Sequence, residues 1–103
     1  MAVTTKTFFR GAATTTTTTT LYTTAATETA IITNIVAANT SSSAQTVTIS
    51  IDGTAVLSAV SVAANSTTAI DLKIPLIASG STKTITGGAS ATSVNLFVSG
   101  VTL

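Results

Sequence analysis

The chain is 103 residues long, the size of a single domain, with 7% charged residues and a formal net charge of +1. It contains neither histidine nor cysteine, which excludes the usual zinc sites, Cys–His nucleophile pairs, Ser-His-Asp triads and a disulfide framework. So small a net charge has little attraction for a phosphate backbone, and we expect no nucleic-acid partner. A hydrophobic fraction of 45% predicts a folded rather than a disordered chain. Threonine makes up about a quarter of the residues, and β-branched side chains favour strands.

The first twenty residues are predicted to form an N-terminal arm and a threonine-rich connection. Residues 3–9 have the composition of a short strand or an arm, which Gly11 and the two alanines after it interrupt. Seven consecutive threonines follow, Thr14 to Thr20, and nothing in such a run determines a strand register. We expect a flexible, extended connection that leads into a strand near Leu21. Ice binding would need the same threonine spacing on neighbouring strands, and only this segment offers it, so a linker is the favoured interpretation.

From residue 29 onward, apolar and polar residues alternate in short segments that are separated by turn signals. The expected strands are residues 29–38, 45–52, 54–58, 67–74, 82–86 and 93–103. Asp52-Gly53 predicts a two-residue hairpin turn. Pro75 is expected to end its strand, Gly87-Gly88 to break the next one, and a bulge is expected near Gly100. The alternation also predicts inward-facing side chains, namely Val47, Ile49, Ile51, Ile70, Leu72, Ile85, Val94, Leu96 and Val98.

Seven or eight short strands with frequent turns predict an all-β fold. We expect a small antiparallel β-sandwich, immunoglobulin-like or jelly-roll-like, that forms one domain over residues 21–103 with the N-terminal arm outside it. No apolar run approaches the roughly 18 residues that span a bilayer, and the N-terminus lacks the apolar stretch of a signal peptide. We therefore expect no membrane partner.

Candidate catalytic and metal-binding residues are few. The carboxylates are Glu28, Asp52 and Asp71, and Asp52 is explained by its turn. We expect no enzyme activity, no catalytic residue, no metal and no cofactor. Two sequons begin at Asn39 and Asn65, but such tripeptides are frequent by chance in a chain this rich in serine and threonine, and both asparagines are interpreted as turn residues.

Two of the three phenylalanines and two of the four cations lie together near the N-terminus, at Lys6, Phe8, Phe9 and Arg10. One interpretation is an ordinary first strand whose phenylalanines complete the core. The other is an arm that docks on a neighbouring subunit, with the phenylalanines as anchors. These four residues are the candidate subunit-docking residues.

Strand-and-turn motifs recur along most of the chain. They are Leu21–Thr23, Thr29–Asn39, Ala44–Gly53, Val62–Thr67, Ile85–Ala91 and Val94–Val101. In these motifs, over roughly residues 21–103, the chain resembles a group of small virion proteins of tailed bacteriophages. The resemblance implies a place on the outside of the capsid or in the head–tail and tail structures. The chain departs from the pattern at Thr24 to Glu28, where many of those proteins have a Pro-Ala-Gly type of turn, and in its threonine run.

The resemblance and the composition lead to an expected function. We expect a structural virion protein of a tailed phage, a capsid decoration or minor capsid protein that binds the outer shell and bridges capsid subunits. The expected partners are further copies of the chain, with a trimer as the first guess, and the major capsid or other virion proteins. The protein would be assembled in the host cytoplasm. The alternatives are a neck, tail-tube or tail-tip protein and a carbohydrate-binding or adhesin module, for which Tyr22 would be a candidate platform.

Overall fold

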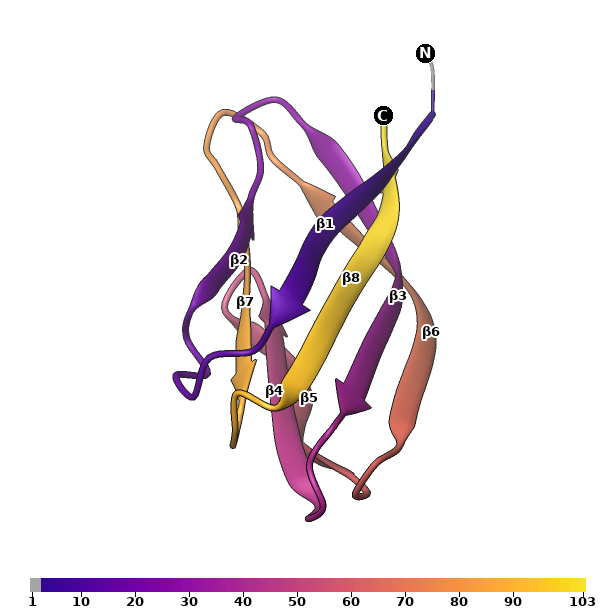
Figure 1. The fold of residues 1–103 in the computed structure, drawn as a ribbon. Coiled ribbons are helices and arrows are strands. Elements are labelled where there is room, and N and C mark those ends of the chain that lie inside the picture. Colours follow the sequence, from indigo (N-terminus) through magenta and orange to yellow (C-terminus); the bar gives the residue numbers. More distant parts are fainter. Residues whose placement is uncertain (1–2) are drawn as a thin grey trace.

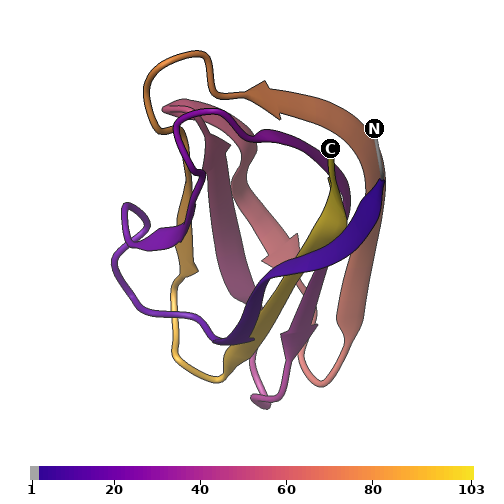
Figure 2. The ribbon, with the colours of Figure 1, turned by 90° about the horizontal axis from the view of Figure 1, so that it is seen from above.

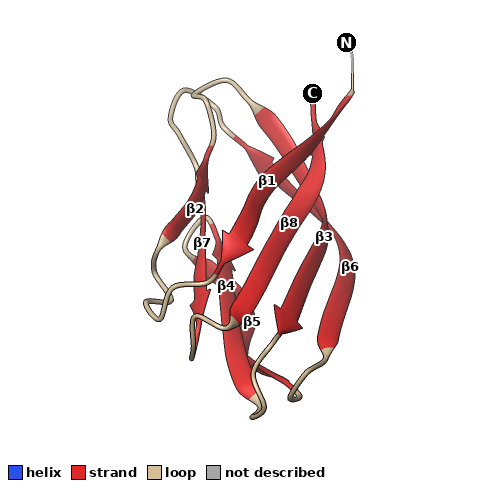
Figure 3. Cartoon of the chain, in the orientation of Figure 1, coloured by secondary structure: helices blue, strands red, loops and turns tan. Residues whose placement is uncertain are grey.

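A computed structural model of the chain describes residues 3–103, which form eight strands and no helix (Figure 3). The strands are β1 (Thr4–Ala12), β2 (Thr20–Thr23), β3 (Thr29–Asn39), β4 (Gln45–Ile51), β5 (Thr54–Val62), β6 (Thr67–Ile77), β7 (Thr84–Ala89) and β8 (Val94–Thr102). The all-β prediction is confirmed. None of the described residues forms a helix that could cross a membrane.

The strands form two four-stranded antiparallel sheets that face each other (Figures 1 and 2). Sheet A has the order β1-β8-β3-β6, and sheet B has the order β2-β7-β4-β5. The first strand pairs with the last, the second with the seventh, the third with the sixth and the fourth with the fifth. A long hairpin rolled into two sheets in this way is a jelly roll. The strand order therefore selects the jelly-roll-like arrangement over the immunoglobulin-like one, whose sheets are built differently.

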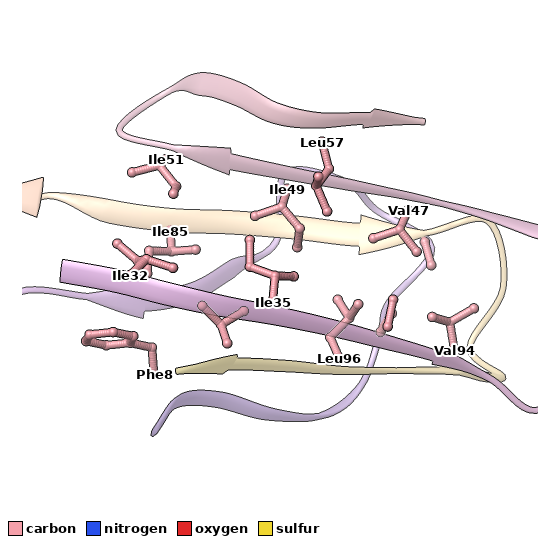
Figure 4. Packing of buried hydrophobic residues seen from close by; sticks show 14 of the residues in the cluster. Phe8, Ile32, Ile35, Val47, Ile49, Ile51, Leu57, Ile85, Val94 and Leu96 are labelled. Atoms are coloured by element: carbon pink, nitrogen blue, oxygen red, sulfur yellow. The ribbon is translucent and has the colours of Figure 1, made fainter. Parts of the chain in front are cut away.

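The core lies between the two sheets and consists mainly of valine, isoleucine and leucine (Figure 4). In β4, Val47, Ile49 and Ile51 are buried while the residues between them are more exposed, as the alternation predicts. Val94, Leu96 and Val98 in β8 are likewise buried. Full burial of such a side chain contributes about 1.5–3 kcal/mol, so these alternating residues supply much of the stability of the sandwich.

The hairpin between β4 and β5 has the predicted turn. Asp52 and Gly53 both have positive φ angles, 52° and 80°. Two successive residues of this kind are the signature of a type I′ turn, whose twist matches that of the flanking strands.

The N-terminal segment belongs to the sandwich, which corrects the expected arm and the domain boundary at residue 20. Residues 4–12 are strand β1, which pairs with β8 at the edge of sheet A. Phe8 is only 5% exposed, and Figure 4 shows its ring at one end of the row of core side chains. Of the two interpretations of this segment, the structure shows the ordinary first strand. Residues 1 and 2 of the expected arm lie outside the described residues.

The threonine run is a compact connection between the sheets rather than an extended linker. The hydroxyl oxygens of Thr14 and Thr19 lie 2.6 Å apart and 3.1 and 2.9 Å from the carbonyl oxygen of Thr16. Since each hydroxyl has one proton, one of them donates to this carbonyl and the other donates to its partner hydroxyl. The run is tied to β7, because Ala89 N donates to Thr14 O and Gly87 N to Thr19 O. Hydroxyl-to-backbone bonds of this kind stabilise turns in place of strand ladders.

Two expected strand breaks are absent, each for a local reason. β6 continues through Pro75 to Ile77, because β6 is an edge strand, where a missing N–H leaves no ladder bond unmade. β7 continues through Gly87-Gly88, both of them buried. A Cβ at Gly88 would lie 2.5 Å from Thr16 O and 2.7 Å from Thr14 O, so glycine is what lets the threonine run lie against β7.

The β-bulges of sheet A lie at neighbouring positions on adjacent strands. The register between β1 and β8 skips Phe8, and the registers of β3 with both its neighbours skip Thr33. The bulge expected near Gly100 is therefore on the strands beside β8. It moves the inward-facing positions of β3 from Ala30 and Ile32 to Ile35 and Ala37.

Candidate docking surfaces

The structure separates the four candidate docking residues. Phe8 and Phe9 both pack against the core, Phe8 as the bulged residue and Phe9 opposite Val98. Lys6 lies opposite Gly100 on the inward side of β1, and Arg10 lies opposite Phe97 on the outward side. The phenylalanines thus pack against the core. Lys6 and Arg10 are both exposed, and of the two Arg10 points to the outer face of sheet A.

Lys6 takes part in a cluster that joins the edge strands β1 and β2. Its ammonium is 5.4 Å from the ring centroid of Tyr22, and the rings of Phe8 and Tyr22 meet edge to face at 4.9 Å. Tyr22 Oη donates to Glu28 Oε2 (2.6 Å), and Ala25 N donates to Glu28 Oε1 (3.0 Å). The ring of Tyr22 is therefore engaged within the chain by Phe8 and Lys6.

The same contacts shift two ionisation equilibria in opposite directions. Burial, together with the hydrogen bond to Glu28, raises the pKa of Tyr22 to about 12. Burial by itself would raise the pKa of Glu28, but the hydrogen bonds from Tyr22 and Ala25 and the charge of Lys6 outweigh it and hold that pKa below its ordinary value. The cluster thus stabilises a neutral phenol beside a carboxylate. Through these contacts it connects the edge strands of the two sheets.

The outer face of sheet A is named face A here. Its residues follow from the register, because residues opposite each other in an antiparallel ladder point to the same side. From β1 to β6, its four rows are Thr5, Val101, Ile31 and Pro75; Thr7, Ser99, Asn34 and Asp71; Arg10, Phe97, Val36 and Ala69; and Ala12, Asn95, Ala38 and Thr67. Large apolar side chains therefore occupy the middle strands of a surface that the described chain leaves uncovered.

One end of face A carries the most exposed large hydrophobic residues of the described chain. Val3 is 64% exposed, Ile77 58% and Leu103 41%. Ile77 pairs with Thr29, and Leu103 N donates to the carbonyl of the same Thr29, so the two flank one position of β3. Alternation places Val3 and Leu103 on the same side as Thr5 and Val101. The apolar surface therefore continues to the edge of the sheet.

The outer face of sheet B is named face B here and has a different chemistry. Its outward residues in register are Thr20, Thr23, Thr46, Thr48, Ser50, Ala55, Ser61, Thr84 and Thr86. Gly88 points to the same side but is covered by the threonine run. In residues 3–103, none of the four strands of sheet B contains a charged residue. A hydroxyl group can both donate a hydrogen bond to water and accept hydrogen bonds from it, so face B is suited to contact with solvent.

A groove runs between the edge strands β5 and β6, on the open side of the sandwich, with a volume of about 380 Å³. Its wall is mainly apolar and includes Val56, Ile74 and Ile77. An ion pair lies at one end, where Lys83 Nζ is 3.6 Å from Asp52 Oδ2. Both side chains are substantially exposed, and such pairs contribute roughly 0–1 kcal/mol. The third carboxylate, Asp71, is on face A, and within residues 3–103 no three acidic groups gather as a metal site would require.

Asn39 is a structurally central residue that the sequence reasoning interpreted only as a turn residue. It is 3% exposed, and its amide nitrogen lies 2.9–3.2 Å from three carbonyls, those of Ser43, Val62 and Ala63. Its amide oxygen accepts from both the N–H and the hydroxyl of Ser41. Asn39 therefore ties β3 of sheet A to β5 of sheet B. The sequence signal for this role is a single asparagine directly after an apolar run. The same pattern also occurs at ordinary turns, so it does not identify a buried asparagine.

Comparison with known proteins gives no family. No protein-family model matches the chain, and no curated protein matches it either.

Proposed function

We propose that this protein is a structural component of a tailed-phage virion, a capsid decoration or minor capsid protein without catalytic activity. The observation that carries the proposal is the apolar face A, whose large side chains are half-buried along its middle strands and exposed at one end. Exposed apolar patches of this kind mark surfaces that other proteins cover. The resemblance of residues 21–103 to small phage virion proteins is the reason for proposing a phage particle as its location.

The jelly-roll strand order supports the proposal as an analogy between folds. Jelly rolls recur in viral capsid proteins, although a fold by itself does not establish a function. In the proposed role the protein acts mechanically. Face A meets a neighbouring subunit in the particle, and the hydroxyl-covered face B is exposed to solvent.

Mass spectrometry of purified particles tests the location. We expect the chain in particles that have passed through a density gradient, in many copies for a shell position. A few copies, set by the symmetry of the tail, would indicate the neck, tail-tube or tail-tip alternative. Absence of the chain from intact particles would contradict the proposal.

A matched pair of variants tests the surface. Phe97→Asp places a charge in the middle of face A, and Ser61→Asp places the same charge on face B. We expect the Phe97→Asp protein to fold but to be lost from particles, and the Ser61→Asp protein to be incorporated like the parent. Equal incorporation of the two would show that face A is not the assembly surface.

A further inference from the structure

We propose that the partner of face A is a second copy of this chain, stacked face to face around a two-fold axis that runs along the strands. The inference rests on the proposed use of face A and does not require the virion location. A two-fold contact uses the same surface on both copies and closes at two subunits. The expected pair thus replaces the trimer that was the first guess from the sequence.

The two-fold axis determines which strands meet. A rotation about an axis that is parallel to the strands and lies between the two faces puts β1 of one copy over β6 of the other and β8 over β3. Stacked sheets keep their strand directions within about 30° of each other, which this arrangement satisfies. Each row of face A then meets the same row of the second copy in reverse order.

The rows are complementary to themselves in this order. Phe97 on β8 meets Val36 on β3 of the second copy, and in another row Val101 meets Ile31. Between these apolar rows, Ser99 meets Asn34. Apolar side chains therefore contact apolar ones, and polar contact polar.

The exposed apolar end of face A is also complementary to itself under this rotation. Val3 and Leu103 lie at the β1 and β8 side of face A, and Ile77 lies at the β6 side. The rotation brings the two sides over each other, so that Val3 of one copy covers Ile77 of the other. The three most exposed large apolar residues of residues 3–103 would all be buried in this contact.

The charges select this axis over the other two-fold arrangement. Arg10 is on β1, and Asp71 is one row away on β6, where Asn34 Nδ2 donates to it (3.1 Å). The third charge of face A, Lys73 on β6, lies beyond Asp71 from the row of Arg10. With the axis along the strands, Arg10 of each copy reaches Asp71 of the other. An axis across the strands would stack β1 on β1, and the outward residues of β1 offer Arg10 no carboxylate.

The area is sufficient for a specific but modest contact. Four strands at a spacing of about 4.8 Å and with a rise of about 3.4 Å per residue give face A roughly 600 Å² per copy. Two copies would bury about 1,200 Å², the lower end of the range for stable interfaces. The dimer should therefore depend on protein concentration.

Charge reversal on the full chain tests the proposal, measured by sedimentation equilibrium over a range of concentrations. We expect a monomer–dimer equilibrium for the parent protein. Arg10→Asp places a carboxylate against Asp71 of the second copy, and Asp71→Arg places a guanidinium against Arg10, so each should weaken dimerisation at least about tenfold. The double variant Arg10→Asp/Asp71→Arg restores opposite charges and should dimerise like the parent.

Controls keep the outcome interpretable. Ser61→Asp on face B should leave the equilibrium unchanged, and circular dichroism should show the same fold for every variant. A parent protein that is monomeric at all concentrations overturns the inference, as do single variants that dimerise normally. A folded double variant that stays monomeric overturns the two-fold geometry. The proposed virion location is tested separately. Absence of the chain from particles would contradict that location and would leave the dimer proposal unaffected.

Discussion

Face A and face B differ although they belong to sheets of the same size in one jelly roll. Face A combines large apolar side chains in its middle strands with Arg10, Asp71 and Lys73 on its edge strands. Face B consists mainly of threonine and serine, and within residues 3–103 it carries no charge. The solvent side of an antiparallel sheet is ordinarily polar, as face B is. The departure of face A from that rule is the observation on which its proposed partner rests.

Gly100 in sheet A and Gly88 in sheet B differ in which atoms lie against them, and this predicts the largest effect. A Cβ at Gly100 would run into the carbonyl of Ile31 on the adjacent strand of sheet A and lie 3.0 Å from Phe8 Cε2. A Cβ at Gly88 in sheet B would meet the loop carbonyls of Thr14 and Thr16, which can move more easily. We expect Gly100→Ala to lower the free energy of unfolding by about 4 kcal/mol and Gly88→Ala by about 2 kcal/mol, measured by urea unfolding.

Gly11→Ala is the matched control for this pair, because its nearest neighbour, Phe9 Cζ, lies at an ordinary 3.6 Å. It should change the stability little. If all three variants had the same stability, the close approach at Gly100 would be disproved.

The connection between the sheets at Asn39 predicts the next effect in size. Asn39→Ala leaves the buried carbonyls of Val62 and its neighbours without their donor and should cost about 3 kcal/mol in thermal or urea unfolding. Asn95→Ala makes the same chemical change on face A and should cost much less. Equal losses would mean that the buried amide does not hold the sheets together.

The second connection between the sheets, at Tyr22, predicts a smaller effect that depends on pH. Because the pKa of Glu28 is lowered by folding, its contribution is present above about pH 4.5 and is lost as the pH falls through the folded value. Because the pKa of Tyr22 is raised, its contribution is present below pH 10 and is lost as the pH rises to about 12.

Tyr22→Phe keeps the ring against Phe8 and removes the hydroxyl. At neutral pH it should cost about 1 kcal/mol, and it should flatten both limbs of the stability profile. Unfolding measured from acid to alkaline pH checks this. Identical profiles for variant and parent would show that the hydrogen bond to Glu28 contributes nothing.

Exchanging residue types between the faces should change stability least and surface behaviour most. Val36→Thr/Val101→Thr on face A and Thr46→Val/Thr86→Val on face B should each shift stability by no more than about 0.5 kcal/mol per residue. On hydrophobic-interaction chromatography, the first variant should elute earlier than the parent and the second later. A face A variant that elutes with the parent would contradict the contrast between the two faces.

Many strands, buried residues and turns of the sandwich can be predicted from local sequence patterns. The alternation of β4 and β8 and the Asp52-Gly53 turn predict their buried residues and hairpin correctly, because period-two burial and a type I′ turn are local properties. The continuation of β6 through Pro75 is not readable, because it depends on β6 being an edge strand. The course of β7 through Gly88 depends equally on a threonine loop that is distant in sequence.

The candidate site is only partly predictable, for the same reason. Lys6, Phe8, Phe9 and Arg10 are adjacent in sequence, but the bulge at Phe8 sends both phenylalanines to the core and leaves Arg10 on the outside. Face A combines residues from β1, β8, β3 and β6, which are far apart along the chain. No window of the sequence contains it.

The amino-acid sequence alone determined that this chain is an all-β sandwich, where most of its strands lie and which side chains alternate into its core. These properties depend on side-chain branching, period-two patterning and turn geometry, which act over a few residues. The tertiary structure decided that the first strand pairs with the last, that β1 belongs to the sandwich, and that apolar residues from four separate strands form one exposed face. Those features depend on strand order and bulges, which are set by packing between residues distant in sequence.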